Sequence, residues 1–459
     1  MQLSRRYGSN RVQNLFVGLL VMGVAACGRG ALQSGAGGRP AGSAGIPGNN
    51  GSGRTSGAGG VGGTLPSSGG SVQPSAGKGG TATGGTATGG SATGGAATGG
   101  AATGGSAIGG SATGGSATGG MATGGSSVGG VQVIAASGDS TCAVVDGEAW
   151  CWGDTPVRVA GLSSGVQAIA VSSASNVCAV IGGEVRCTTG GDPMKVVGLP
   201  PDTLTVAVAW THSCAVAGGG VWCWGENLRG QLGSGSTTDS QLPVLAKDLS
   251  SGAQAVAVSG ERFTCAVVNG GARCWGANGS GQLGNGSTTS SLAPVQVQGL
   301  ASGVQAIATG LGHACAVKDG GVWCWGTNYD GELGNGSTTD SPVPVQVKGL
   351  VSGAQSIAAG MNYSCAVVGG GAWCWGSNYF GKLGNNSKVA SSVPVQVQGL
   401  DSGVQAIACG GYPNETPSSG HTCALTNGSI RCWGSNYKGQ LADGTHTAAL
   451  VPNPPIQFP

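Results

Sequence analysis

The feature that most constrains this chain is a pair of cysteines nine positions apart around a two-residue turn. In CAVKDGGVWCWG, residues 315–326, Cys315 and Cys324 flank two short apolar runs. The midpoint is Asp319-Gly320, which suits a type I′ turn because both central residues need positive φ. A turn centred there makes the cysteines a non-hydrogen-bonded pair with Cα atoms about 4.5 Å apart, within the roughly 4.4–6.8 Å that a disulfide spans. The spacing predicts a disulfide-closed β-hairpin.

The same spacing recurs six more times, always around a turn dipeptide such as Gly-Gly or Asn-Gly. The other pairs are Cys142 with Cys151, Cys178 with Cys187, Cys214 with Cys223, Cys265 with Cys274, Cys365 with Cys374 and Cys423 with Cys432. Reduced core cysteines and metal ligands are the alternatives, but one hairpin supplies only two thiolates and a structural zinc needs four ligands. Seven local disulfides are therefore favoured, and they indicate an oxidising compartment. No metal site is expected.

Residues 1–26 have the pattern of an export signal. Three arginines precede an apolar run, residues 15–26, that is too short for a membrane helix. The run ends in VAAC, which resembles the bacterial lipoprotein box and makes Cys27 the expected lipidation site. In bacterial lipoproteins an Asp directly after the lipidated cysteine often signals retention in the inner membrane. Gly28 occupies that position here, so we expect the protein at the outer membrane or cell surface. The alternative is an ordinary cleaved signal followed by an incidental cysteine.

Residues 27–130 consist mainly of Gly, Ala, Ser and Thr, and from residue 81 they form ten pentapeptides of the SATGG type. Such a composition buries too little apolar surface to offset the entropy lost on ordering. We expect a disordered tether between the membrane and the rest of the chain. A glycosylated or self-associating stalk is the alternative.

Residues 131–459 contain seven repeats, most of about fifty residues. A full repeat runs VQAIATG, HACAVKDG, GVWCWG, TNYDGELGNGSTTDSP and VPVQVKGL. Four of these segments have the pattern of short strands, and the fourth in order has that of a turn-rich loop. A four-stranded antiparallel unit of this period predicts the blade of a β-propeller. The first two repeats lack the NxxGxLG loop and should form smaller blades, while the seventh carries an insertion at 412–420. The chain ends in PIQFP, which is equivalent to the VPVQV strand, so we expect residues near 455–458 to pair in the same blade as residues 131–136 and to supply its fourth strand.

The stretch VQAIATGLGHACAVKDGGVWCWGTNYDGELG and its counterparts resemble the regulator of chromosome condensation repeat family across 131–459. The resemblance implies an all-β, seven-bladed propeller. The founding member is a guanine-nucleotide exchange factor, other members sense ultraviolet light through tryptophans, and a secreted bacterial relative inhibits β-lactamases through one propeller face. No exchange-specific or light-sensing residue carries over by position, and the paired cysteines depart from the intracellular members.

The candidate binding residues are the two variable positions of the NxxG loops. They include exposed aromatic and cationic side chains, which are typical interface anchors: Arg229, Tyr329, Tyr379, Phe380, Tyr437 and Lys438. The alternative is that these side chains only cover the loop beneath them. The tryptophans beside the second hairpin cysteine are expected to pack between blades, with a light-sensing cluster as the alternative.

Three histidines and one cysteine have structural interpretations. His212, His313 and His421 precede the first hairpin cysteine by two residues, where other repeats have Ser, Asn, Phe or Tyr, so we expect a structural position. Cys409 occupies a strand position and is expected to be a buried free thiol, with disulfide exchange at Cys423 as the alternative.

The function expected from these features is an envelope-anchored, protein-binding propeller without catalysis or cofactor. A net charge of +2 with 8% charged residues gives no basic field for nucleic acid, and no catalytic constellation stands out. The partner would be a protein at the cell surface, reached by recognition, inhibition or adhesion. The alternative is regulatory activity of the nucleotide-exchange type, as in the founding family member.

We predict that Cys27→Ser moves the protein from membrane to soluble fractions, because the acyl chains that hold it are attached to that sulfur. Fractionation followed by immunoblotting measures the shift, with Cys409→Ser as the control that keeps the lipobox. A Cys27→Ser protein that sediments with membranes as the wild type does would contradict the lipoprotein hypothesis.

Overall fold

The computed structural model describes residues 130–459 except 174–175, 189–190, 261 and 412–418, together with the backbone of 112–113 and 116–117. The predictions for the signal segment, Cys27 and most of the 27–130 tether lie outside these residues, as does most of the 412–420 insertion. No helix in the described part is long and apolar enough to cross a membrane.

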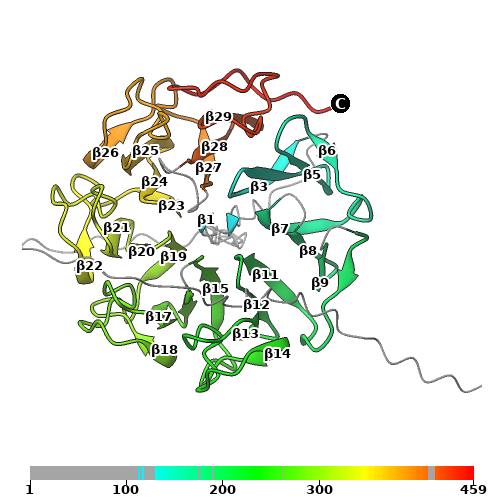
Figure 1. The fold of residues 1–459 in the computed structure, drawn as a ribbon, viewed down its shortest axis with the longest axis vertical. Coiled ribbons are helices and arrows are strands. Elements are labelled where there is room, and N and C mark those ends of the chain that lie inside the picture. Colours follow the sequence, from blue (N-terminus) through cyan, green and yellow to red (C-terminus); the bar gives the residue numbers. More distant parts are fainter. Residues whose placement is uncertain are drawn as a thin grey trace, which may run out of the picture. The chain divides into compact units, whose positions relative to one another are not determined.

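Seven antiparallel sheets form a ring, with the first strand of each sheet innermost (Figure 1). The seven-bladed propeller is confirmed. The first three blades are β3 (Val131–Ser137), β4 (Ser140–Val145), β5 (Glu148–Trp152) and β6 (Val157–Arg158); β7 (Val166–Ser173), β8 (Asn176–Ile181), β9 (Glu184–Cys187) and β10 (Met194–Lys195); and β11 (Thr203–Val208), β12 (His212–Ala217), β13 (Gly220–Gly225) and β14 (Ser240–Leu245). The outer strands β6 and β10 have only two residues each, so the first two blades are smaller, as predicted.

The remaining blades follow the same order along the chain. They are β15 (Ala253–Val258), β16 (Phe263–Val268), β17 (Gly271–Gly276) and β18 (Ser291–Gln296); β19 (Val304–Thr309), β20 (His313–Lys318), β21 (Gly321–Gly326) and β22 (Ser341–Gln346); β23 (Ala354–Ala359), β24 (Tyr363–Val368), β25 (Gly371–Gly376) and β26 (Ser391–Gln396); and β27 (Val404–Cys409), β28 (His421–Thr426) and β29 (Ser429–Gly434). The short strands β1 (Ala112–Thr113) and β2 (Ser116–Ala117) pair with each other, and β1 pairs with β23. They lie within the range predicted to be a disordered tether.

The central hairpin of each blade has the register that its turn predicts. In the fifth blade Asp319 and Gly320 both have positive φ, 50° and 78°, and Cys315 lies opposite Cys324. The two cysteines form a disulfide with a Cα separation of 4.0 Å, slightly closer than the spacing that the turn geometry suggested.

The other six hairpins contain the corresponding bridges, with Cα separations of 4.0–4.1 Å. Cys142 is bonded to Cys151, Cys178 to Cys187, Cys214 to Cys223, Cys265 to Cys274, Cys365 to Cys374 and Cys423 to Cys432. Every bridge closes its own hairpin, as predicted. Cys409 is free and buried, which agrees with the structural interpretation of that thiol. Most of the bridged cysteines are buried, whereas Cys151 and Cys187, in the two small blades, are only half-buried.

The core lies between blades rather than inside one. Each blade is a single sheet, so its apolar side chains pack against the facing sheet. The disulfide Cys265–Cys274 of the fourth blade, for example, belongs to one buried cluster with Trp325 of the fifth. The disulfide of the fifth blade lies in the same way against Trp375 of the sixth. The predicted packing of tryptophans between neighbouring blades is confirmed at these positions.

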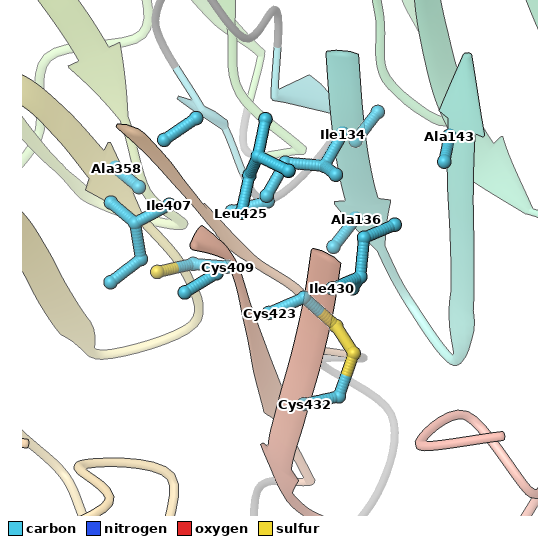
Figure 2. Close-up of a cluster of buried hydrophobic side chains, with 14 of the residues drawn as sticks. Ile134, Ala136, Ala143, Ala358, Ile407, Cys409, Cys423, Leu425, Ile430 and Cys432 are labelled. Atoms are coloured by element: carbon cyan, nitrogen blue, oxygen red, sulfur yellow. A yellow bond between two sulfur atoms is a disulfide. The ribbon is translucent and has the colours of Figure 1, made fainter. Parts of the chain in front are cut away.

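The ring closes between the seventh blade and the first. Side chains of β27, β28, β29 and β3 belong to one apolar cluster, which includes Ile134, Leu425 and the Cys423–Cys432 disulfide (Figure 2). Because this seam is packed like the other blade boundaries, the ring needs no strand shared between the two ends of the chain.

The C-terminal segment does not complete the first blade, so a pairing of residues near 455–458 with that blade, which the repeat pattern suggests, is wrong. Asn453 N–H donates to Cys432 O at 2.9 Å and Ile456 N–H to Ile430 O at 2.8 Å, so the segment lies along β29 of its own blade. In the first blade β6 already pairs with β5 as the fourth strand, so that place is not available to the C-terminal segment. The Phe458 ring contacts the first blade at Trp150 and Trp152.

We predict that Phe458→Ala lowers the melting temperature by a few degrees. The Phe458 ring lies 5.9 Å from both Trp150 and Trp152 in edge-on geometry, and such pairs contribute about 0.5–1.5 kcal/mol each beyond the buried area. Calorimetry measures the shift, and Gln457→Ala, one residue earlier and exposed, is the control. Equal melting temperatures for all three proteins would show that this contact does not stabilise the seam.

Candidate functional site

One face of the ring is built from the NxxG loops that follow the third strand of blades three to seven. A buried asparagine organises each loop. In the fifth blade the Asn328 side chain donates to Ser337 O and Thr339 O at 3.0 Å and accepts from Leu333 N at 2.9 Å. The corresponding asparagines, Asn227, Asn278, Asn378 and Asn436, are equally buried and bonded. These loops are therefore ordered platforms.

The loop glycine fits each platform to the next blade. Gly331 has a φ of 84°, and a Cβ added there would lie 2.5 Å from the Cα of Ser392 in the outer strand of the sixth blade. Only glycine satisfies both the left-handed backbone and this close approach. The recurrence of Asn and Gly is thus structural, as the sequence suggested, and the variable positions between them are left to solvent.

Most of the predicted binding residues are exposed on these platforms. Tyr329, Tyr379 and Tyr437 are 71%, 55% and 56% exposed. Phe380 is half-buried, with its ring 5.2 Å from that of Tyr437 and nearly perpendicular to it. The cations Arg229 and Lys438 are also exposed. These loops leave corresponding ends of successive blades, so all of these residues lie on one face, here named the loop face.

The second hairpin tryptophan connects each of these loops to the following blade. Its indole N–H donates to the backbone carbonyl of the residue that follows the loop glycine in the preceding blade. The pairs are Trp275 to Gln231, Trp325 to Gln282, Trp375 to Glu332, Trp433 to Lys382 and Trp152 to Gln440, at 2.8–3.2 Å. In the third blade Trp224 follows a blade that lacks the loop, and it is only half-buried.

The three histidines that precede a hairpin cysteine by two residues also lie at blade boundaries. Each Nε2 lies 2.7–2.9 Å from a hydroxyl of the next blade, in the pairs His212–Thr264, His313–Ser364 and His421–Thr141. Each hydroxyl in turn donates to the carbonyl that the tryptophan uses. The histidine must therefore carry its proton on Nε2. At the boundary between the fourth and fifth blades, Phe263 stands at the histidine position and Ala314 stands at the position of the hydroxyl residue. Both partners are therefore apolar at this boundary.

Burial holds these imidazoles neutral. Desolvation lowers the pKa of His212 and of His313 to about 3 and that of His421 to about 4. The Nδ1 atoms of His313 and His421 have no hydrogen-bond partner among the described residues. Protonation would place an N–H there without an acceptor, which disfavours the charged form.

A second buried polar cluster, which the sequence did not reveal, lies between the sixth and seventh blades. Lys382 Nζ lies 5.0 Å from the centre of the Tyr363 ring and donates to Met361 O at 3.3 Å. Desolvation lowers the pKa of Lys382 to about 8 and raises the pKa of the Cys409 thiol to about 12. A thiol with that pKa stays protonated and unreactive. The only sequence signal was a lysine where other loops have Gln or Glu.

The described residues hold no group of three or more His, Cys, Asp or Glu side chains arranged to bind a metal ion. The loop face presents aromatic rings and cationic side chains on backbone-ordered loops, which suits recognition of another macromolecule.

Comparison with known families identifies the repeats. The model described as the regulator of chromosome condensation (RCC1) repeat matches residues 218–267, 269–317, 319–367 and 369–413, and a second RCC1 repeat model matches 304–332. The chain carries RCC1 repeats. Each matched RCC1 unit begins at or beside a hairpin turn, and the first three end near the next one, so they combine the outer half of one blade with the inner half of the following blade. The fourth match ends at residue 413, before β28.

Curated relatives match over part of their length. A probable E3 ubiquitin-protein ligase, HERC4 from Rattus norvegicus, is 30% identical over 189 residues, 40% of this chain and 16% of the relative. The ultraviolet-B receptor UVR8 from Arabidopsis thaliana is 30% identical over 171 residues, 37% of this chain and 34% of the receptor. The chain thus spans about a third or less of these relatives, and both are eukaryotic proteins.

Solved structures with the same fold include human WBSCR16, with a TM-score of 0.54 at 23% identity over 66% of this chain and 84% of that one. Yeast RCC1 (Prp20), solved bound to Kap60, gives a TM-score of 0.56 at 18% identity over 66% of this chain and 78% of that one. At these identities the likeness shows the RCC1 fold alone.

We predict that the RCC1 propeller loses stability as pH falls from about 6.5 toward 4. The three histidines have folded pKa values below the ordinary 6.5, so between about pH 6.5 and 4 the unfolded chain binds more protons than the folded one. Each histidine therefore lowers the folding equilibrium constant about tenfold for each unit by which the pH falls. Glu332 opposes this between about pH 7 and 4.5, because desolvation raises its pKa to about 7. The loss of stability from three histidines is larger than the gain from one carboxyl, so the net effect of acidification is destabilising.

The matched variant is His313→Phe with Ser364→Ala, which copies the apolar pair that the chain uses between its fourth and fifth blades. Denaturant unfolding at pH 7 and pH 5 should show a pH-dependent loss smaller than that of the wild type by one histidine's contribution. An unchanged pH dependence would show that His313 is not among the titrating groups.

Proposed function

We propose that this chain is a non-enzymatic protein-binding propeller that captures a protein partner on its loop face. The observation that carries the proposal is the arc of Tyr329, Tyr379 and Tyr437, exposed on three successive blades. Tyrosine supplies a large amphipathic contact surface at low cost in side-chain entropy, and it is enriched at binding hot spots.

The platforms beneath these tyrosines support the proposal. Each tyrosine directly follows a buried asparagine that holds hydrogen bonds within its loop, so little backbone conformational entropy is lost on binding. The hairpin-turn face of the ring has exposed apolar residues too, such as Val351 at 64%, but no corresponding set of aromatic side chains on consecutive blades in the described part.

We further propose that the propeller acts at a bacterial cell envelope, where lipid on Cys27 holds it and residues 28–130 extend it from the membrane. The lipobox sequence and the composition of the tether support this location, and seven disulfides fit an oxidising compartment. The expectation of nucleotide-exchange activity rests on the family resemblance alone, and no described residue adds to it.

The test replaces Tyr329, Tyr379 and Tyr437 together with serine in the full chain. Proteins captured from an envelope extract and enriched about tenfold or more by the wild type should be lost from the triple variant, because each tyrosine anchor contributes on the order of 1–2 kcal/mol or more. Quantitative mass spectrometry measures the enrichment. The control is Val351→Ser, which removes an exposed apolar side chain from the opposite face.

Loss of the same proteins from the Val351→Ser sample, or their full retention by the triple variant, would place binding elsewhere. Circular dichroism should be unchanged in both variants because all four side chains are exposed. The melting temperature should be unchanged for Val351→Ser and fall by at most a few degrees for the triple variant, because Tyr437 loses its edge-on contact with the Phe380 ring.

A further inference from the structure

A cavity of about 530 Å³ lies between the third and fourth blades on the loop face. Arg229, from the loop of the third blade, and Arg262, from the bend between β15 and β16, both line it. Thr211, Ser290 and Gly279 are further lining residues, and no described lining residue is acidic. The cavity therefore presents two guanidinium groups with hydroxyl and amide groups around them.

The two arginines retain unused donors. Arg262 Nη2 lies 3.2 Å from Glu226 Oε2, but the buried Arg262 Nε has no partner among the described residues. The Arg229 guanidinium likewise makes no hydrogen bond or ion pair within the described part, although its backbone N–H donates to Gln231 Oε1 at 2.9 Å. With Glu226 counted, these three side chains carry one excess positive charge, which a single monoanion neutralises.

Arg262 adopts a backbone conformation that a long side chain rarely takes. Its φ is 67°, in the left-handed region, where the sixth blade has Asn362 at the corresponding position, with φ 55°. Asparagine tolerates this region, whereas arginine is strained there by about 1 kcal/mol. Backbone strain retained at a cavity wall indicates a functional constraint on that side chain.

Beside the cavity, the loop of the fourth blade has a glycine at the position where the other four loops have a large side chain. Gly279 stands where the other loops have Leu228, Tyr329, Tyr379 and Tyr437. Gly279 has no positive φ, and a Cβ added there would meet nothing within 4 Å. A larger residue is therefore sterically permitted at this position, and its absence leaves the two arginines accessible.

We propose that this cavity binds a carboxylate side chain, an Asp or Glu of the protein partner, between Arg229 and Arg262. Guanidinium groups bind carboxylates through paired, charge-assisted hydrogen bonds, and the one excess charge fits a monoanion better than a phosphate dianion. The inference rests on the proposed function, because it names the chemistry of the partner that the loop face receives. The cavity gives that face an acid-specific position beside the aromatic arc.

The test needs no identified partner. Phenylglyoxal modifies exposed arginines of the full chain at neutral pH, and peptide mass spectrometry follows each arginine separately. Acetyl-Gly-Glu-Gly-amide at millimolar concentration should slow modification of Arg229 and Arg262 at least threefold, while acetyl-Gly-Gln-Gly-amide and sodium chloride at equal ionic strength should not. Arg273, which does not line the cavity, serves as the internal control.

Two variants make the assignment specific. Gly279→Tyr introduces the residue that the loops of the fifth, sixth and seventh blades have at this position, and it should abolish protection by the Glu peptide. Arg262→Asn keeps a residue suited to positive φ, so the fold should be at least as stable, and it should remove protection from Arg229.

Equal protection by the Glu and Gln peptides, or protection by inorganic phosphate alone, would overturn the carboxylate assignment, and so would protection that survives in both variants. Because the probes are small peptides, this experiment tests the carboxylate site alone. The capture experiment with the triple tyrosine variant tests protein binding independently of it.

Discussion

A hydrogen bond from a tryptophan indole to the loop carbonyl of the preceding blade is the interaction on which the order of this propeller depends. It recurs at five blade boundaries, including the seam between the seventh and first blades. A sheet one layer thick cannot bury its own faces. The tryptophan packs against the disulfide of the preceding blade, and its indole N–H donates to the loop of that blade. One side chain therefore both fills the apolar space between blades and holds the loop in position.

This dependence explains why the loop face is suited to binding. The loops are anchored from below by their buried asparagines and from the side by the next blade's tryptophan, so the variable residues are displayed on a fixed backbone. Where a blade lacks the loop, as the first two do, the outer strand is short and the following tryptophan, Trp224, is half exposed. Three tyrosines and the arginine-lined cavity all belong to loop-bearing blades.

The hairpin register, the seven disulfides and the blade count could be predicted from the sequence, because turn dipeptides and cysteine spacing act over ten residues. The variable NxxG positions could also be identified, since they change while their neighbours do not. The route of the C-terminus could not. Residues 452–459 could supply the outer strand of either the first or the seventh blade, and β6 fills that place in the first blade.

The sequence by itself thus determined the local units: turns, hairpins, bridges and the loops organised by asparagine. Tertiary structure decided what meets across blade boundaries, where partners lie about fifty residues or, at the seam, about three hundred residues apart. It paired His313 with Ser364, directed the Tyr363 hydroxyl to His421 O and set Arg229 beside the same cavity as Arg262. Local rules are carried by backbone dihedrals of adjacent residues, whereas these contacts depend on closing the whole ring.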